Sequence, residues 1–287
     1  MPPALTCRPR PTRRRLLRMM LGGLGAAAVP NAGGADPPAD APLELGIFPF
    51  LPTLEIGRQF GPLATALADS LERPISLRTK AGFPAFRLAL HEARFDIALL
   101  HPFLYSDVVH FQDYRPLARL RDDLVGVVVV PESRMVTGYG DLRGEKLAVP
   151  PALSAVAQLV ELELRRAELD GPDGVRLVHH RTKTACLHAV VTGQAAACVV
   201  PEFLLDQFAA ASPIALEGKF RTASIPGILF VGHARLGTAT LERLQDTFVG
   251  WNHSADGRRL LAGLGWSGLV AVGPDDYDTA ALSPAAE

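Results

Sequence analysis

Three polar residues of this chain lie where a predicted strand ends or a predicted helix begins, and such positions can bind small ligands. Ser154 and Thr184 stand at the starts of two predicted helices. Each hydroxyl could cap its helix, and the first backbone N–H groups of a capped helix can also bind an anion. His101 ends a predicted buried strand, where its ring could donate to an anion or ligate a metal. Each residue also has a structural interpretation, as a helix cap or as a histidine hydrogen-bonded to backbone.

Two cysteines, Cys186 and Cys198, form a second candidate group. The predicted helix that carries Cys186 and the predicted strand that carries Cys198 run in opposite directions, so the helix start and the strand end should lie close together. Three interpretations stay open. The residues could be two small buried thiols, they could form a disulfide, or they could bind a soft ligand such as arsenite or a transition metal with His188 or His101.

Aromatic side chains and one further hydroxyl belong to the same predicted region. Phe50 and Phe83 could form the apolar walls of a cleft, or they could pack in the core. Tyr105 lies one helical turn after His101 and could line the same cleft, although half-buried packing would explain it as well. Thr53 follows a proline-rich loop and could cap the next helix.

The sequence contains no compact catalytic motif. A Gly-x-Ser-x-Gly elbow, a phosphate-binding loop, a zinc-protease helix and a paired Cys-x-x-Cys motif are all missing. We therefore expect a binding protein and not an enzyme, and we expect no cofactor.

The charge balance excludes several classes of partner. The first 35 residues contain six arginines and no acidic residue, so the rest of the chain has 23 basic and 30 acidic residues. This balance provides no basic field for nucleic acid or anionic lipid. A local basic group, His179-His180-Arg181 with Lys183, could attract an anion, but a solvated loop would explain it too.

The N-terminus has the order of an export signal: a basic block, an apolar run and then small residues. The block Thr12-Arg13-Arg14-Arg15 matches the twin-arginine pattern. The apolar run that follows has 11 residues, which is too short for a bilayer span of about 20. We expect residues 1–35 to be the signal, with Cys7 removed, and 36–42 to be a flexible N-terminus of a periplasmic protein. A basic tail or a short membrane anchor is the alternative.

Strands and helices alternate along the rest of the chain, which predicts α/β architecture. We expect two lobes with two crossings between them, each lobe a mainly parallel sheet flanked by helices. Residues 43–130 and 225–287 would form the first lobe and residues 131–224 the second. Pro62 predicts a break in the first helix. Ligands of such folds bind at the carboxyl ends of strands. The predicted strands are 43–47, 75–79, 95–100, 124–130, 146–149, 175–179, 196–200, 220–224 and 228–231. The predicted helices are 53–71, 83–93, 103–111, 155–169, 184–192, 201–210, 238–249 and 256–264.

Five stretches, taken together in their order along the chain, resemble the periplasmic substrate-binding proteins of phosphate, phosphite and phosphonate ABC transporters. The resemblance implies the two-lobed type II periplasmic binding protein fold, closure on a small oxyanion, an ABC permease as partner and no catalytic turnover. It also implies that the anion is held at a helix start in the second lobe, here residues 150–157. The matching stretches are Gly46-Ile47-Phe48-Pro49-Phe50-Leu51-Pro52, Phe95-Asp96-Ile97-Ala98 with Tyr105, Tyr114-Arg115-Pro116-Leu117-Ala118, Asp141-Leu142-Arg143-Gly144-Glu145-Lys146-Leu147-Ala148 and Ser224-Ile225-Pro226.

The chain departs from the family pattern at four places, and each departure makes the expected cleft less polar. Of the family's Ser/Thr-rich run, only Ser154 remains here. Thr184 to His188 stands where the family usually has a Ser-His pair, Ala195 to Cys198 where an Asp is common, and Gly82-Phe83 where an Asp-Tyr pair is frequent. We expect a monomer that delivers an oxyanion such as phosphate, phosphite or a phosphonate to the permease. The alternative is a ligand-sensing module for a membrane histidine kinase, with a soft ligand such as arsenite or a metal.

Overall fold

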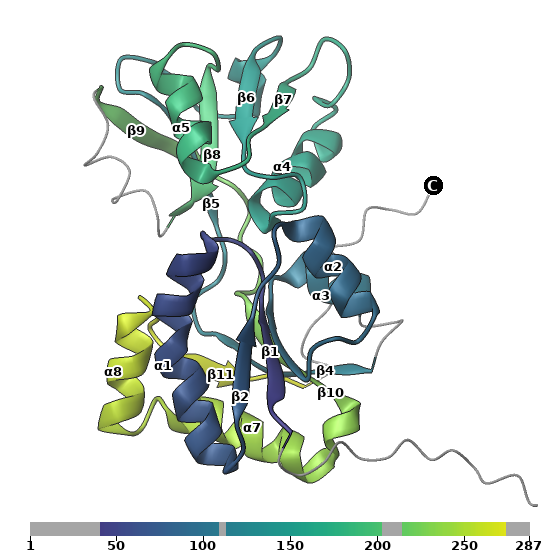
Figure 1. The fold of residues 1–287 in the computed structure, drawn as a ribbon. Helices are drawn as coiled ribbons and strands as arrows, with labels where there is room; N and C mark the ends of the chain where they lie inside the picture. Colours follow the sequence, from purple (N-terminus) through teal and green to yellow (C-terminus); the bar gives the residue numbers. More distant parts are fainter. Residues whose placement is uncertain (1–40, 109–112, 203–213, 274–287) are drawn as a thin grey trace, which may run out of the picture. The chain divides into compact units, whose positions relative to one another are not determined.

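Apolar strands that are buried on both faces form the centres of two sheets. The computed structural model describes residues 41–108, 113–202 and 214–273, and every residue of β3 (Ile97–Leu100) and β8 (Ala197–Pro201) is buried. Figure 1 shows the two sheets, each with helices against it. The predicted two-lobed α/β fold is confirmed. The expected export signal, most of the 36–42 segment and parts of the helices predicted at 103–111 and 201–210 lie outside the described residues.

Lobe 1 is built on six strands: β1 (Leu43–Ile47), β2 (Ile75–Arg78), β3, β4 (Tyr114–Leu120), β10 (Leu229–His233) and β11 (Leu269–Ala271). Their order in the sheet is β11-β4-β10-β3-β1-β2. β1 is parallel to both β2 and β3, while β10 runs antiparallel to its neighbours β3 and β4. Because β1 and β3 are adjacent and parallel, the loops that follow them lie at the same edge of the sheet.

Among the described residues, the helical segments that accompany this sheet are α1 (Thr53–Leu71), α2 (Phe83–His91), α3 (Pro102–Val108), η3 (Ala234–Leu236), α7 (Thr238–Gly250) and α8 (Ala255–Gly263). α1 contacts α7 and α8, and α2 contacts α3. One large apolar core joins them to the sheet, with stacked ring pairs such as Phe230 and Phe248 at 4.2 Å between centroids. In residues 41–108, 113–202 and 214–273, no helix combines the length and the apolar character that a membrane span needs.

α1 is continuous through Pro62, so the predicted break is wrong. A proline inside a helix costs about 3 kcal/mol or more, because it removes one hydrogen bond and crowds the preceding turn. Ile56, Phe60, Leu63 and Leu67 of the same helix are fully buried against the core. Burial of each such side chain stabilises the fold by roughly 1.5–3 kcal/mol, so their sum outweighs the proline.

Lobe 2 is built on the five-stranded sheet of β5 (Gly126–Pro131), β6 (Lys146–Val149), β7 (Arg176–His179), β8 and β9 (Leu216–Arg221). β6, β7 and β8 are parallel to one another, whereas β5 and β9 run antiparallel to their neighbours. Their order is β7-β6-β8-β5-β9. The helices α4 (Ala155–Arg166) and α5 (Lys183–Val191) belong to two separate apolar clusters. Alternate residues of β5 enter each cluster, so the two helices cover opposite faces of the sheet. A short helix, η1 (Tyr139–Leu142), precedes β6.

Two paired segments connect the lobes. The N–H of Leu124 donates to the carbonyl of Ile225 at 2.8 Å, and the N–H of Ile225 donates back at 3.1 Å. Next to this pair, the Thr222 hydroxyl accepts a hydrogen bond from the N–H of Gly126 at 2.8 Å. β5 pairs with β8 and β9, so the strand that the sequence analysis placed at the end of the first lobe lies in the second sheet. The first crossing therefore comes before Gly126.

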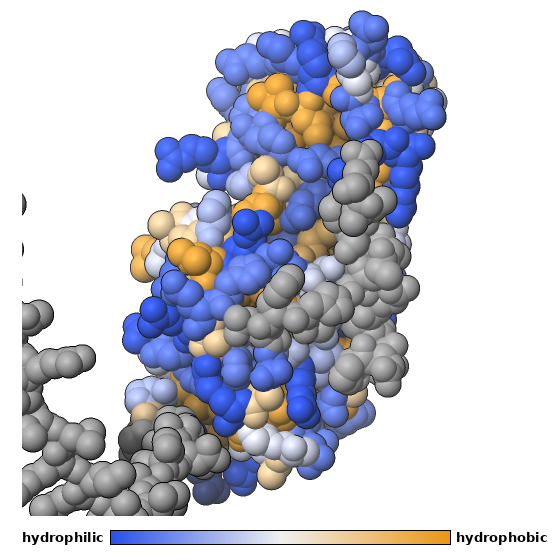
Figure 2. Space-filling view, turned by 90° about the vertical axis from the view of Figure 1, so that its right-hand side faces the viewer, coloured by the Kyte–Doolittle hydropathy of each residue, from blue (hydrophilic) through white to orange (hydrophobic). Residues whose placement is uncertain are grey.

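The surface carries few large apolar side chains. The face shown in Figure 2 is mostly hydrophilic, with an apolar patch in its upper part. Over the described ranges, the exposed large apolar residues are Leu54, Leu88, Met135 and Ile214. Apolar side chains scattered singly over a surface are normal in folded proteins.

Candidate functional site

Helix α4 begins with a hydroxyl cap at Ser154, as predicted. The Ser154 backbone is extended, and its Oγ accepts a hydrogen bond from the N–H of Ala157 at 3.4 Å. Ser154 and Ala155 expose only 9% and 6% of their surfaces. The start of α4 is therefore covered by other parts of the protein.

His101 of lobe 1 is bound to the residue just before this cap. Its Nδ1 accepts from the N–H of Leu104 at 3.3 Å, and its Nε2 lies 3.0 Å from the carbonyl oxygen of Leu153. Since Nδ1 is the acceptor, Nε2 carries the proton and donates it to that carbonyl. Burial lowers the pKa of His101 to about 3, so the ring is neutral at pH 7. Both nitrogens are hydrogen-bonded to backbone, which is the structural interpretation of this histidine.

Aromatic rings surround His101. Phe48 and Phe83 lie 5.5 Å and 5.9 Å from it between ring centroids, and Phe50 stacks on Phe48 at 4.7 Å. Phe103 lies 6.3 Å away and packs against α4. The structure thus brings the predicted residues Phe50, Phe83 and His101 together. Phe48 was not singled out as a site residue, although the alternation Phe48-Pro49-Phe50 in one loop is a usable signal.

The cap of helix α5 lies two residues before the predicted one. Thr182 is the cap, because its backbone is extended and its Oγ1 accepts from the N–H of Ala185 at 3.1 Å. Thr184 is the second residue of the helix and is exposed, so the prediction that it caps α5 is wrong. Both residues are threonines, and the local sequence did not distinguish them. In contrast to Ser154, Thr182 is exposed.

Lys183, the first residue of α5, is a cation at the edge of the aromatic cluster. Its Nζ lies 5.3 Å from the centroid of the Phe50 ring. The residue is half-buried, and burial lowers its pKa to about 8, against the opposing effect of Glu55. Lys183 is therefore mainly charged at pH 7. In the sequence, Lys183 stands out only as part of a basic group, because its neighbour Phe50 is far away in the chain.

Two other predicted site residues, Tyr105 and Thr53, do not take their predicted roles. Tyr105 is 1% exposed within the core of lobe 1, and burial raises its pKa to about 12. It is a core residue in this structure and does not line an open cleft. Thr53 is the first residue of α1, where Pro52 occupies the cap position without a side-chain hydrogen bond, so the predicted cap by Thr53 is wrong.

The two thiols lie together inside lobe 2. The sulfur atoms of Cys186 and Cys198 are 2.8 Å apart, and both residues are fully buried. His188 is exposed and is not brought to them. A search of the described residues finds no group of three or more His, Cys, Asp or Glu side chains that could hold a metal ion.

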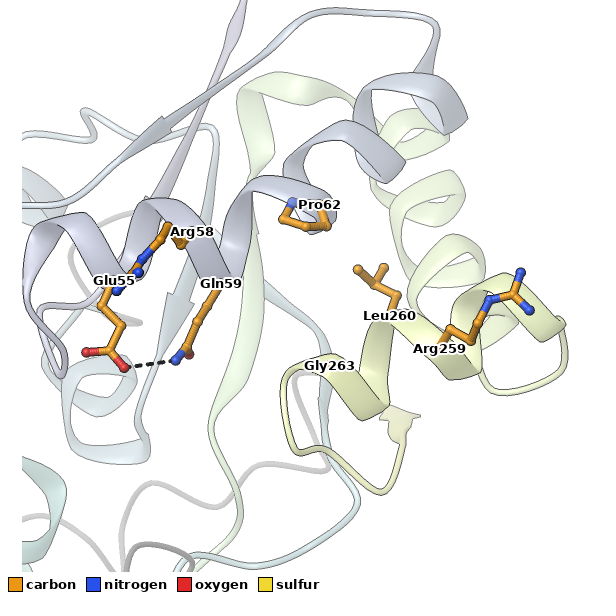
Figure 3. Close-up of a pocket in the computed structure, with 7 residues that line it drawn as sticks. All are labelled: Glu55, Arg58, Gln59, Pro62, Arg259, Leu260 and Gly263. Carbon is orange, nitrogen blue, oxygen red and sulfur yellow. Dashed lines mark hydrogen bonds between the residues drawn. The ribbon is translucent and has the colours of Figure 1, made fainter. Parts of the chain in front are cut away.

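A surface groove lies elsewhere on lobe 1, between α1 and α8 (Figure 3). Its volume is about 480 Å³, and a hydrogen bond of 3.1 Å joins Gln59 to Glu55 along it. None of its residues was predicted as a site residue, and the helix starts of lobe 2 do not contribute to it. The groove is lined by Glu55, Arg58, Gln59, Pro62, Arg259, Leu260 and Gly263.

Two α/β lobes joined by two crossings define the class of two-lobed periplasmic binding proteins. The sequence profile of one family, described as the periplasmic substrate-binding protein of phosphonate ABC transporters, matches residues 45–277. The chain belongs to this family, as the resemblance in the sequence predicted. A search of curated protein sequences finds no match.

Solved structures support the fold. A binding protein component of a Pseudomonas aeruginosa ABC phosphonate transporter has a TM-score of 0.71 at 14% identity, covering 83% of this chain and 84% of that chain. PhnD1 of Prochlorococcus marinus in complex with methylphosphonate has a TM-score of 0.72 at 12% identity, covering 83% and 95%. A Xanthomonas citri protein bound to ATP has a TM-score of 0.71 at 15% identity, covering 84% and 94%.

Membership in this family makes the chain a substrate-binding protein of ABC transport, with a small molecule as ligand and a permease as partner. Proteins of this family work in the periplasm. The interpretation as a sensor for a histidine kinase is not favoured.

Proposed function

We propose that this protein binds a small phosphorus oxyanion of the phosphonate class at the start of α5. Lys183 carries the proposal, because it places a half-buried ammonium group at a capped helix start and beside an aromatic ring. The first turn of a helix attracts anions through its N–H groups and its dipole. A cation in the same place adds a charge-assisted hydrogen bond to a phosphonate oxygen.

The aromatic cluster suits the other end of such a ligand. An alkylphosphonate has an apolar group on phosphorus, and the half-buried ring of Phe50, which stacks on the buried Phe48, offers an apolar surface. Ser154 could contribute through the start of α4, but that helix start is buried and is held by lobe 1 through His101. We therefore assign the main anion contact to Thr182, Lys183 and the first turn of α5.

The test is a calorimetric titration of the full chain with methylphosphonate. Lys183→Gln should weaken binding roughly tenfold or more, because a hydrogen bond to a charged group contributes about 1.5–3 kcal/mol. Lys146→Gln is the matched control, since Lys146 is exposed and lies at the first residue of β6, at the opposite end of this strand from the proposed site. Equal affinity in the wild type and Lys183→Gln would contradict the proposed site. Binding of ATP or sulfate in preference to methylphosphonate would contradict the ligand class.

We also propose that the chain is exported by the twin-arginine route and works as a monomer. The paired arginines before an apolar run support this route. Replacing Arg13 and Arg14 with lysines should leave the protein in the cytoplasm of a bacterial host, whereas Arg8→Lys and Arg10→Lys should not. Periplasmic recovery of the doubly substituted chain would contradict the route, and a light-scattering mass of two chains would contradict the monomer.

A further inference from the structure

Cys186 of α5 and Cys198 of β8 form a contact that the proposed function does not use. Their sulfur atoms are 2.8 Å apart, which is closer than the ordinary packing distance of two thiols. An S–S bond is about 2.0 Å long, so only a small movement separates the pair from a covalent bond. Neither residue exposes any surface, and both belong to the apolar cluster between α5 and the sheet.

The surroundings of the pair argue against a transition-metal site. Around the sulfurs lie apolar residues, among them Val129, Ala148 and Val200. His188 is exposed, and a residue two positions from Cys186 does not share its helix face. Transition-metal sites in proteins take three or four ligands, and the part of the chain that the structure describes brings no such group together.

We propose that Cys186 and Cys198 form an intramolecular disulfide in the exported protein. Because neither sulfur is exposed in the folded lobe, the reaction takes place while the pair is open to solvent during folding. One cysteine thiolate then attacks a sulfur of a disulfide oxidant, expels one thiol and leaves a mixed disulfide. The second cysteine then attacks the mixed disulfide, forms the Cys186–Cys198 bond and expels the second thiol. The two cysteines together lose two protons and two electrons. The oxidant takes up these protons and electrons and becomes two thiols. Such bonds persist in oxidising compartments, including the bacterial periplasm.

The bond would fasten the start of α5 to the centre of the lobe 2 sheet. Cys186 is the fourth residue of α5, about one turn after Lys183, and Cys198 lies in a fully buried strand. A cross-link between these two residues lowers the conformational entropy of the unfolded chain and so stabilises the folded state. Its effect on a ligand at α5 rests on the proposed function, but the bond itself does not.

The test uses the full chain with Cys7→Ser, so that only these two thiols remain. The protein is unfolded with reductant, refolded with oxidised glutathione, denatured again and treated with iodoacetamide. Mass spectrometry should then find no label and a mass lower by two hydrogens. The melting temperature should be roughly 5–10 °C above that of the reduced protein, and dithiothreitol should remove the difference.

Single variants complete the test. Cys186→Ala and Cys198→Ala should each accept one label, and dithiothreitol should not change their melting temperatures. Alanine avoids the buried hydroxyl that serine would introduce. Two labels on the wild-type pair after oxidative refolding would overturn the proposal, and a bond without any change in melting temperature would overturn its stabilising role. No step uses a phosphonate, so the outcome is independent of the proposed ligand.

Discussion

The starts of α4 and α5 have the same local chemistry and different surroundings. In each helix a hydroxyl oxygen accepts from the N–H three residues on, from Ser154 to Ala157 and from Thr182 to Ala185. The start of α4 is buried, and lobe 1 covers it through His101. The start of α5 is exposed at Thr182 and carries a cation. One capping pattern therefore serves as a contact between lobes in one helix and as a candidate anion site in the other.

The difference depends on what lobe 1 places against each helix. α4 receives a neutral imidazole and the ring of Phe103, which use the helix start for packing. α5 receives the face of Phe50 near the ammonium group of Lys183, which also feels the negative charge of Glu55. A helix start can bind an anion only where no other group occupies the position of the anion. The comparison teaches that a cap seen in the sequence does not by itself identify a binding site.

The largest effect that would test this comparison is the response of stability to acid. His101 has a pKa of about 3 in the folded protein and about 6.5 in the unfolded chain. Its contribution is therefore fully present above pH 6.5 and is lost as the pH falls toward 3. The loss over this window is roughly 4 kcal/mol. In urea unfolding below pH 6.5, the stability of the wild type should fall relative to that of His101→Gln, which does not titrate. A difference that is constant with pH would contradict the neutral contact at α4.

The next effect is the loss of stability on removing this ring at neutral pH. His101→Ala removes packing against Phe48 and Phe83, and it removes one of the two side-chain donors to the Leu153 carbonyl, the other being Gln158. We expect the free energy of unfolding to fall by about 2–4 kcal/mol. His188→Ala is the control, because His188 is exposed, and its effect should stay within about 0.5 kcal/mol. Equal losses in the two variants would show that His101 does not hold α4.

The smallest effect separates the two helix starts by affinity. Aspartate is a good helix cap, so Thr182→Asp should keep α5 folded while placing a negative charge near the ligand. We expect its affinity for methylphosphonate to fall about tenfold, which is about 1.4 kcal/mol. Ser154→Asp should weaken binding less, and Thr182→Ser should leave it nearly unchanged. A larger loss in Ser154→Asp than in Thr182→Asp would move the anion site to α4.

Local patterns predicted much of the fold. The apolar run 95–100 contains β3, and the run 124–130 contains most of β5, because a strand buried on both faces has few polar residues. The same reasoning failed at Pro62, where proline chemistry predicted a break. The packing of Phe60 and Leu63 in the core decided otherwise, and that packing involves residues from other elements.

The helix starts show how far local reasoning extends. Ser154 was identified as a cap because no other hydroxyl stands near it. At α5, Thr182 and Thr184 are both plausible caps, and the burial of Cys186, Leu187 and Val190 fixed the phase of the helix. With the helix beginning at Lys183, that lysine comes to the edge of the aromatic cluster. Its position could not be deduced from the spacing of threonines.

The sequence by itself determined the family, the two α/β lobes and the cap of α4, because these depend on apolar periodicity and on short ordered stretches. The tertiary structure alone decided the partner of His101, which lies 52 residues away at Leu153, and the contact of Lys183 with Phe50. It also brought the sulfurs of Cys186 and Cys198 to 2.8 Å. Side chains far apart in the chain meet only when the packing of whole elements fixes their positions, and no local propensity contains that information.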